Sequence, residues 1–470
     1  MKILVINVSL RPNPVRVFLP IGLGYVVSAM KRGGFEFDLL DLDIHQLSPE
    51  KTREYLQTHR YDVVAMGCIV TGYRQVKWLA GTIKEAFPET VIVVGNTVAQ
   101  SITELLLTKT GADVAVMGEG DETIVELLAH LRDSRNLEEV RGICFLRDGK
   151  MVTTPPRPLI ANLDTIPFPE WDLFEVESYI QNLSKTLDEP LPPIPKEDIR
   201  AMTVNTARGC PYNCTFCYHT FRGQKYRWRS ADSLIQEIRH CQERYGINYL
   251  FFADELTFFS LKQAEEFSDT LLNSGLKIYW KGDCRSGLFS KPEHVEVAQK
   301  LKAAGALAFG FSLESANPEI LKWMNKKVGP EVFSRQVEIL RRAGIASLTS
   351  IVIGYPNETP ETIKSTIDCC IANGIYPSAG YLLPQPGTPM YTYALEHGYI
   401  QDEEDYLLKL GDRQDLRLNL TDMSDAQLEG TLQQELARCS RELGLDLGDG
   451  SLLKTGRYRS PQQGLEPKIA

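Results

Sequence analysis

Strand-like and helix-like segments alternate along most of this chain, and the alternation limits the folds open to it. In the first 150 residues, five short apolar runs read as buried strands: KILVINVS, FEFDLLDL, YDVVAMGCIV, TVIVVGN and ADVAVMGEG. Segments with helical spacing of apolar residues lie between them. This order predicts an α/β fold, with a parallel sheet covered by helices on both faces. Such a doubly wound, Rossmann-like sheet binds its ligand at the carboxyl ends of the strands.

The same alternation resumes after a proline-rich stretch. Prolines gather in TTPPRPL, IPFPEWD and EPLPPIPKED, and helical spacing fades there, which indicates a linker. Further on, six strand–helix repeats predict a partial (β/α)6 TIM barrel, which stays open because eight repeats are needed to close one. We therefore expect a Rossmann-like domain at 1–150, a linker at 151–200, a barrel at 201–398, and a helical C-terminal region with a flexible tail at 399–470.

Charge and composition exclude several classes of function. The chain has 470 residues and a formal net charge of −10, which argues against nucleic acid as a partner. No apolar run approaches the roughly 20 residues that span a bilayer, and the N-terminus lacks the pattern of a signal peptide. We expect a cytoplasmic protein without a transmembrane segment, whose ten cysteines are reduced and available for metal binding or chemistry.

Three of these cysteines lie within eight residues, directly after the first predicted barrel strand. Cys210, Cys214 and Cys217 are separated by three and by two residues in ARGCPYNCTFCYHT. A structural zinc ion takes four ligands, usually from two pairs, and no second pair lies nearby. His219 is too close to Cys217 to complete a good tetrahedron. A [4Fe–4S] cluster normally takes four cysteines, so three would leave one iron open to a small molecule.

The spacing Cys-x3-Cys-x-aromatic-Cys, with Phe216 as the aromatic residue, resembles the signature of the radical S-adenosylmethionine (SAM) superfamily. In that family the open iron of a [4Fe–4S] cluster binds SAM, and one electron from the cluster releases a 5′-deoxyadenosyl radical. The resemblance implies that Cys210, Cys214 and Cys217 are the metal ligands and the catalytic centre. It also implies an electron donor such as flavodoxin or ferredoxin.

Further barrel stretches extend the resemblance in the family's order: FFADELTF, FGFSLESANPEI, IVIGYPNET and YLLPQPGTPMY. Simpler interpretations also exist. The second strand could end in solvated acidic residues, Asn317 and Pro318 could cap a helix, and Arg285 could form a salt bridge at the end of the third strand. Cys284 and Arg285 are expected to face the cavity. The SAM contacts that the resemblance implies are Asp254, Glu255, Arg285, Glu314, Ser315, Gly354, Glu358 and the backbone near Leu382.

The first domain resembles the cobalamin-binding domain that precedes some radical SAM barrels. MGCIVTG, VVGNT and VMGEGDET follow its third, fourth and fifth strands, and PFPEWDLF in the linker is typical of that group. Small residues there suit the corrin and its nucleotide tail, although they suit any nucleotide-like ligand. Gly95-Asn96 stands where a glycine pair is more usual. The implied cobalamin contacts are Gly67, Cys68, Thr71, Gly95, Asn96, Thr97, Gly118, Glu119 and Gly120.

His45 in DIHQLS superficially resembles a cobalt ligand, but two features depart from the motif. Ser48 replaces the motif's glycine, and the stretch follows the second strand rather than the first. The loop after the first strand, residues 9–20, contains no histidine. We expect a surface position for His45 and base-off cobalamin without a histidine ligand from the protein.

The resemblance implies cobalamin-dependent radical SAM catalysis on a small-molecule substrate, with C-methylation of an unactivated carbon as the favoured reaction. The alternative is a cyclase or ring-rearranging enzyme of a tetrapyrrole, hopanoid or antibiotic pathway, without net methyl transfer. A tRNA methylthiotransferase would need a second cysteine triplet in the first domain, where only Cys68 and Cys144 occur. A cluster-bearing sensor without enzymatic activity leaves the SAM-type motifs unexplained. The basic stretch FRGQKYRWRS suits an anionic substrate, an electron donor or a solvated loop equally.

Overall fold

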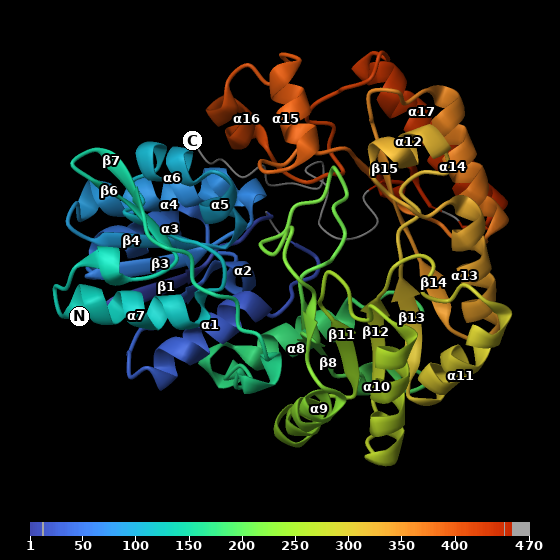
Figure 1. Cartoon of the computed structure of the whole chain (residues 1–470), viewed down its shortest axis with the longest axis horizontal. Helices are drawn as coiled ribbons and strands as arrows, with labels where there is room; N and C mark the ends of the chain where they lie inside the picture. The colour runs from blue at the N-terminus through green and yellow to red at the C-terminus, as the bar shows by residue number, and fades with distance from the viewer. Residues whose placement is uncertain (12–13, 446, 454–470) are drawn as a thin grey trace.

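The computed structural model describes residues 1–11, 14–445 and 447–453 and places two α/β units side by side (Figure 1). Most of the tail predicted to be flexible, residues 454–470, lies outside the described residues. The first unit is a seven-stranded sheet in the order β2-β1-β3-β4-β5-β6-β7. Strands β1 to β5 are parallel, as the alternation predicted. Their bounds are β1 (Ile3–Asn7), β2 (Asp38–Asp41), β3 (Val63–Gly67), β4 (Val91–Gly95) and β5 (Val114–Val116).

Helices cover both faces of this sheet, which is why β1 is buried along its whole length. The helices α1 (Ile21–Arg32) and α7 (Gly120–Arg132) pack together on one face. The other face carries α3 (Pro49–Thr58), α4 (Tyr73–Ala86) and α6 (Thr103–Lys109). Two short helices, α2 (Leu42–His45) and α5 (Asn96–Ser101), directly follow β2 and β4.

The sheet continues beyond the five predicted strands as an antiparallel hairpin of β6 (Ile143–Arg147) and β7 (Lys150–Thr153). Asp148 and Gly149 at its turn have φ values of 52° and 72°. An Asp-Gly pair with two positive φ angles is typical of a two-residue hairpin turn. The pair was the sequence signal for this hairpin.

The second unit is an open barrel. Five parallel strands lie in the order β14-β13-β12-β11-β8, and two more form a separate parallel pair, β15-β16. The predicted fifth strand is divided at Thr349 into β14 and β15, and the bridge between Glu314 and Ile351 joins the two sheets. The bounds are β8 (Ala201–Val204), β11 (Tyr249–Phe252), β12 (Tyr279–Asp283), β13 (Ala306–Gly310), β14 (Ala346–Leu348), β15 (Ser350–Ile353) and β16 (Ser378–Tyr381).

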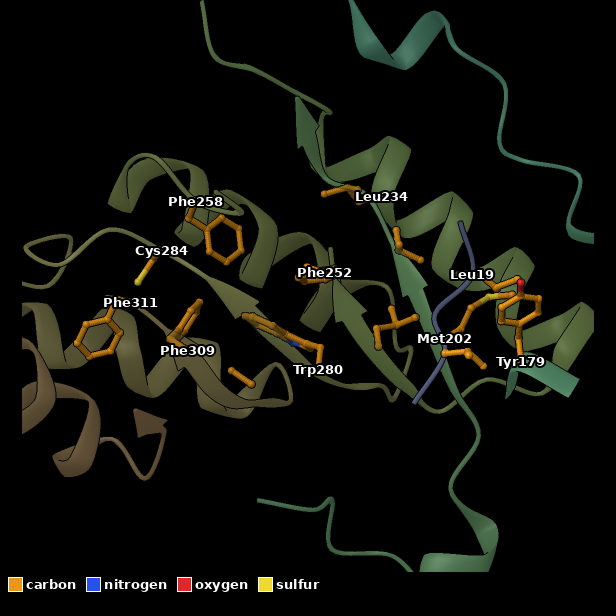
Figure 2. Packing of buried hydrophobic residues seen from close by; sticks show 14 of the residues in the cluster. Leu19, Tyr179, Met202, Leu234, Phe252, Phe258, Trp280, Cys284, Phe309 and Phe311 are labelled. Carbon is orange, nitrogen blue, oxygen red and sulfur yellow. The ribbon is translucent and has the colours of Figure 1, made fainter. Parts of the chain in front are cut away.

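Aromatic side chains fill the core between the barrel strands and the outer helices (Figure 2). The rings of Trp280 and Phe309 meet edge to face at 5.5 Å, an arrangement that aromatic pairs prefer. Cys284, expected to face the cavity, lies in this core instead, with its Sγ 3.4 Å from Nε2 of Gln336. The outer helices are α9 (Ala231–Tyr245), α10 (Leu261–Asn273), α11 (Val295–Ala303), α12 (Pro318–Trp323), α13 (Pro330–Arg342) and α14 (Pro360–Ala372).

The linker and the C-terminal region join the two units. The linker contains a helix that its prolines obscured in the sequence, α8 (Val176–Lys185), and this helix packs on β8. From α8, the Tyr179 hydroxyl donates a hydrogen bond to the carboxylate of Asp41 in the first unit at 2.8 Å. Of the C-terminal helices α15 (Pro389–Glu396), α16 (Glu403–Lys409) and α17 (Asp425–Glu442), α16 packs on α4 and α17 on α14. Within the described residues, no helix is both long and apolar enough to cross a bilayer.

Candidate functional site

The three closely spaced cysteines lie on a loop that leaves and returns to one place beside the barrel. The loop begins after β9 (Ala207–Arg208) and ends at β10 (Arg227–Trp228), which pairs antiparallel with β9. Cys210, Cys214 and Cys217 lie between these strands and are free thiols, as are the other seven cysteines. One loop therefore carries all three thiols.

Thr215, in the middle of this loop, is held from several sides. Its N–H donates to the carbonyl of Met324 at 3.0 Å, and its hydroxyl lies 2.8 Å from the carbonyl of Trp323 and 2.9 Å from the hydroxyl of Tyr355. Arg222 donates from Nη1 to the carbonyls of the second and third cysteines. The protein's own hydrogen bonds therefore fix the loop.

The three thiols lie near enough to interact electrostatically with one another. Burial raises the pKa of Cys210 and Cys214. Cys217 is exposed at the surface, and desolvation by the loop, followed by the Cys214 and Cys210 thiols, raises its pKa to about 12. Among the described residues, no three His, Cys, Asp or Glu side chains are arranged around a single metal ion. A [4Fe–4S] cluster distributes its cysteine ligands over several iron atoms, so each of the three thiols would bind a different iron.

His219 lies two residues beyond this triplet and is buried. Neither of its ring nitrogens finds a hydrogen-bond partner within the described part of the chain. Burial lowers the pKa of His219 and so favours the neutral imidazole, whereas the charge of Glu255 acts in the opposite direction. Unpaired buried polar atoms are rare in proteins, and here they fit a site that receives a bound group.

Asp254 and Glu255, after β11, both reach the start of the cysteine loop. Oδ1 of Asp254 accepts hydrogen bonds from Asn205 Nδ2 at 2.6 Å and from the N–H groups of Thr206 and Ala207 at 2.8 and 3.0 Å. Oε2 of Glu255 accepts from the N–H of the glycine before the first cysteine at 3.3 Å. The Asp254 carboxylate is therefore largely used by the turn that launches the loop, whereas Glu255 is more available to a ligand.

Glu314 and Ser315 follow β13 in a strained turn. Glu314 has a φ of 64°, a conformation that non-glycine residues seldom adopt outside functional sites. Its buried carboxylate forms an ion pair with Nζ of Lys326 at 3.1 Å. Ser315 accepts the N–H of Asn317 at 3.1 Å, and Asn317 accepts the N–H of Ile320 as the cap of α12. The capping alternative is thus confirmed for Asn317, while the Glu314 turn lies beside the cysteine loop, where its charge raises the pKa of the second and third thiols.

Gly354, Glu358 and Leu382 lie together where β15 and β16 end. Gly354 has a φ of 110°, which favours glycine, and its N–H donates to Oε2 of Glu358 at 3.2 Å. Burial raises the pKa of Glu358 to about 7. The N–H of Leu382 donates to the carbonyl of Ile353 at 2.7 Å, so its carbonyl rather than its N–H remains for a ligand.

Arg285 and Phe216 flank the loop in different ways. The guanidinium of Arg285 lies over the ring of Tyr212 at 3.4 Å, and no carboxylate lies within ion-pair distance of it among the described residues. Stacking of this kind stabilises a planar cation and leaves the outer nitrogens of the guanidinium for an anion. Phe216 packs, partly buried, against the core that the first sheet shares with the C-terminal helices.

Three glycines form a smooth surface where β3, β4 and β5 end. Gly67 and Gly95 are paired in register, and a Cβ built at either one meets its nearest atoms only at 3.8 to 4.0 Å. A Cβ at Gly118 meets no described atom within 4 Å. Asn96 has a φ of 68°, which explains why asparagine can replace the usual second glycine. The space left beside these three glycines suits the close approach of a planar group such as a corrin.

The other candidate cobalamin contacts differ in position. Thr97 uses its hydroxyl to accept the N–H of Val70 at 2.9 Å. Cys68 is buried, and its Sγ packs against Gly72, so it belongs to the domain core. Thr71 lies in the short turn Val70–Gly72, and Gly120 begins α7.

Glu119 connects the first unit to the cysteine loop. Its carboxylate accepts from Arg208 Nη1 at 2.7 Å, from Arg227 Nη1 at 2.9 Å and from the N–H of Ile160 in the linker at 2.7 Å. Arg208 also binds Asp121 with both Nη atoms at 3.0 Å. Both arginines are buried and stand in β9 and β10, at the base of the loop. The structure thus places Glu119 in the interface between the units, with its carboxylate occupied.

Gln100, a residue that sequence reasoning missed, makes a second bridge. Its Oε1 accepts the N–H of Gly118 at 3.3 Å, and its Nε2 donates to the carbonyl of Thr220 in the cysteine loop at 3.1 Å. No motif marks this residue, because the bridge depends on two loops that are distant in sequence.

The basic stretch after the cysteines is divided: Tyr226, Arg227 and Arg229 are buried, whereas residues 223–225 and Trp228 are exposed. Arg227 is bound by Glu119, and Arg229 forms a buried ion pair with Glu237 of α9. His45, by contrast, lies as expected near the surface, where its Nε2 is 2.8 Å from the carboxylate of Glu175.

Two family models match the chain, one in each unit. The B12 binding domain model matches residues 14–128, and the radical SAM superfamily model matches residues 204–370. An uncharacterized methyltransferase of Pyrococcus horikoshii is 28% identical over 384 residues, which cover 81% of this chain and 79% of the relative. The anaerobic magnesium-protoporphyrin IX monomethyl ester cyclase of Rubrivivax gelatinosus is 27% identical over 353 residues, covering 74% and 61%.

The solved structures agree on the fold. The radical SAM methyltransferase TsrM from Kitasatospora setae aligns with a TM-score of 0.66 at 18% identity, covering 85% of this chain and 76% of its own. A radical SAM domain works with a [4Fe–4S] cluster and SAM, and a B12 binding domain works with cobalamin. The chain therefore carries a region similar to the radical SAM superfamily at residues 204–370, preceded by a match to the B12 binding domain at residues 14–128.

Proposed function

We propose that this protein is a cobalamin-dependent radical SAM methyltransferase that acts on an unactivated carbon of a small molecule. One observation carries the proposal: Gln100 ties the glycine surface of the B12 binding domain to the cysteine loop, through Gly118 on one side and Thr220 on the other. The two cofactor sites therefore face one interface. A substrate held there would reach both cofactors without leaving the protein.

We propose Cys210, Cys214 and Cys217 as the cluster ligands. When bound, the cluster and SAM supply the radical that removes a hydrogen atom from the substrate. The chain's own residues hold the site: Thr215 and Arg222 fix the loop, and Asp254 fixes its first turn. For SAM we propose Glu255, Arg285 and the turns at Glu314–Ser315 and Gly354–Glu358, with the carbonyl of Leu382, as binding groups.

We propose that the corrin lies on Gly67, Gly95 and Gly118 and that no imidazole of the protein binds the cobalt. The contact between His45 and Glu175 supports this proposal, because His45 is the histidine whose surrounding sequence resembles a cobalt-ligand motif, and its ring already binds a carboxylate. Cobalamin supplies the methyl group to the substrate. The glycine surface orients the corrin and excludes water from its face.

We also propose a flavodoxin or ferredoxin as the electron donor and the cytoplasm as the compartment. Exposed Trp228 and Phe259 both contact the ring of Tyr226, near the first cysteine, and support docking of such a donor beside the loop. For the units of function we propose residues 1–150, 151–200, 201–398 and 399–470. The end of the first sheet at Thr153 and the start of β8 at Ala201 support these bounds.

The cyclase or ring-rearranging alternative is favoured by the similarity to the Rubrivivax gelatinosus cyclase. Anaerobic reconstitution with iron, sulfide and hydroxocobalamin, followed by incubation with SAM and a strong reductant, separates the two. A methyltransferase yields S-adenosylhomocysteine together with 5′-deoxyadenosine. Formation of 5′-deoxyadenosine alone, by protein with full iron and cobalamin content, would contradict methyl transfer and leave the alternative.

A further inference from the structure

A buried lysine faces the interior of the barrel. Lys281 of β12 is paired in register with Phe251 of β11, which is paired with Thr203 of β8, so the three residues form one row across three strands. Their neighbours Trp280 and Phe252 point the other way, into the core between sheet and helices (Figure 2). Because side chains alternate between the two faces of a strand, the row of Thr203, Phe251 and Lys281 faces inward.

Lys281 has fewer partners than a buried cation normally has. Its side chain is almost fully buried, and Nζ donates to the backbone carbonyl of Asp188 at 2.9 Å. Within the described residues, no carboxylate lies within 4.0 Å of Nζ; the rings of Tyr249 and Phe251 lie 6.0 and 5.8 Å away. An ammonium group offers three donors, and a buried charge is costly unless it is paired.

Two buried hydroxyls on the neighbouring strands, Thr203 of β8 and Tyr249 of β11, are also unsatisfied. Oγ1 of Thr203 and the hydroxyl of Tyr249 find no hydrogen-bond partner among the residues that the structure describes. Each can donate to an oxyanion. The charged groups around them are Arg16, whose guanidinium binds the exposed carboxylate of Asp188 at 2.8 Å, and Glu189.

The charge of Lys281 persists at neutral pH. Burial lowers its pKa to about 8, while the carboxylates of Asp188 and Glu189 act in the opposite direction and Arg16 acts with burial. A group with a pKa near 8 is mainly protonated at pH 7. One cation and two hydroxyls without described partners therefore lie on the inner face of three neighbouring strands.

We propose that Lys281, Thr203 and Tyr249 bind an oxyanion of the substrate, a carboxylate or a phosphate, carried on an apolar body. The inference rests on the proposed function, because it puts the substrate below the SAM-binding strand ends. Phe251 precedes Asp254 by three residues, roughly 10 Å along the chain. Phe18 offers apolar surface beside the row: it is 42% exposed and meets Phe251 edge to face at 5.8 Å.

The test uses the reconstituted holoenzyme and three probes: benzoate, phenyl phosphate and the neutral benzyl alcohol. Calorimetric titration should show binding of at least one anion, and Lys281→Met should weaken it tenfold or more, whereas Lys281→Arg should weaken it less than threefold. Affinity for benzyl alcohol should not change. Lys277→Met, which removes an exposed lysine four residues earlier, is the matched control and should bind like the unmodified protein. Preference for benzoate or for phenyl phosphate identifies the anion.

Thr203→Val is the second variant, because it replaces an unpaired hydroxyl with a methyl group of the same shape. It should fold at least as stably as the unmodified protein and still weaken anion binding two- to fivefold. Cofactor function is followed separately through iron content, cobalamin content and 5′-deoxyadenosine formed without substrate, all of which Lys281→Met should preserve. The proposal is overturned if neither anion binds, if Lys281→Met binds it as tightly as the unmodified protein, or if that variant loses SAM cleavage.

Discussion

Replacing Glu119 with glutamine should destabilise the protein far more than its single lost charge suggests. The carboxylate is 6% exposed and accepts from Arg208, Arg227 and the N–H of Ile160. Glutamine keeps the shape but offers one acceptor oxygen, and its NH2 group faces donors. Removing one partner of a buried ion pair costs about 3–5 kcal/mol. Because Arg208 retains both of its hydrogen bonds to Asp121, we expect a loss of about 2–4 kcal/mol.

Urea and thermal unfolding of the apoprotein measure this effect. For a cooperative unit of 150 to 250 residues, such a loss lowers Tm by about 5–15 °C. Glu122→Gln is the matched control. Glu122 lies three residues later, in the first turn of α7; its side chain is 61% exposed and meets Arg157 at 3.4 Å, so its removal should cost less than about 1 kcal/mol. If the two variants unfold within about 1 kcal/mol of each other, the reasoning on the interface is wrong.

Four further changes test other parts of the site. Burial raises the pKa of Glu358 to about 7 from 4.5, so the folded protein binds this proton more tightly than the unfolded chain does. The free energy of unfolding should therefore fall by up to about 3 kcal/mol between pH 4.5 and pH 7. Glu358→Gln should flatten this pH dependence in urea titrations. Cys214→Ala should abolish the [4Fe–4S] absorbance after reconstitution, whereas Cys241→Ala, in the core under α9, should keep it. Gly95→Ala should fold normally, because its Cβ meets only an atom at 4.0 Å, yet lower bound cobalamin at least fivefold. Thr215→Val removes two hydrogen bonds from the cysteine loop and should lower iron per chain without changing the circular dichroism spectrum.

The sheets and the cysteine loop could be predicted because their signals are local. Apolar runs of strand length mark β1, β3 and β4, and the spacing of three thiols marks the loop. The helix α8 was missed because prolines on both sides hid the helical spacing of Tyr179, Ile180 and Leu183. The break between β14 and β15 was missed because one continuous apolar run can serve two sheets.

The partners of individual site residues could not be predicted, since they come from distant parts of the chain. Asp254 was assigned to the cofactor from its motif, yet its carboxylate binds the turn 47 to 49 residues before it. Glu119 lies 89 residues from Arg208 and 108 from Arg227. A motif identifies which residues carry chemistry, but the docking of the two units decides which of them are already occupied.

The docking also connects the two proposed cofactor sites mechanically. Glu119 stands between Gly118 and Gly120, in the loop proposed to meet the corrin, and it holds Arg208, two residues before the first cysteine. Gln100 links the same loop to Thr220, three residues after the last cysteine. The cysteine loop is therefore held to the corrin loop at its start, by Arg208, and beyond its third cysteine, by Thr220. A displacement of Gly118 must shift Gln100, Arg208 or both, so these short polar contacts act together with the linker contacts of Tyr179 and Ile160 to set the distance between the two sites.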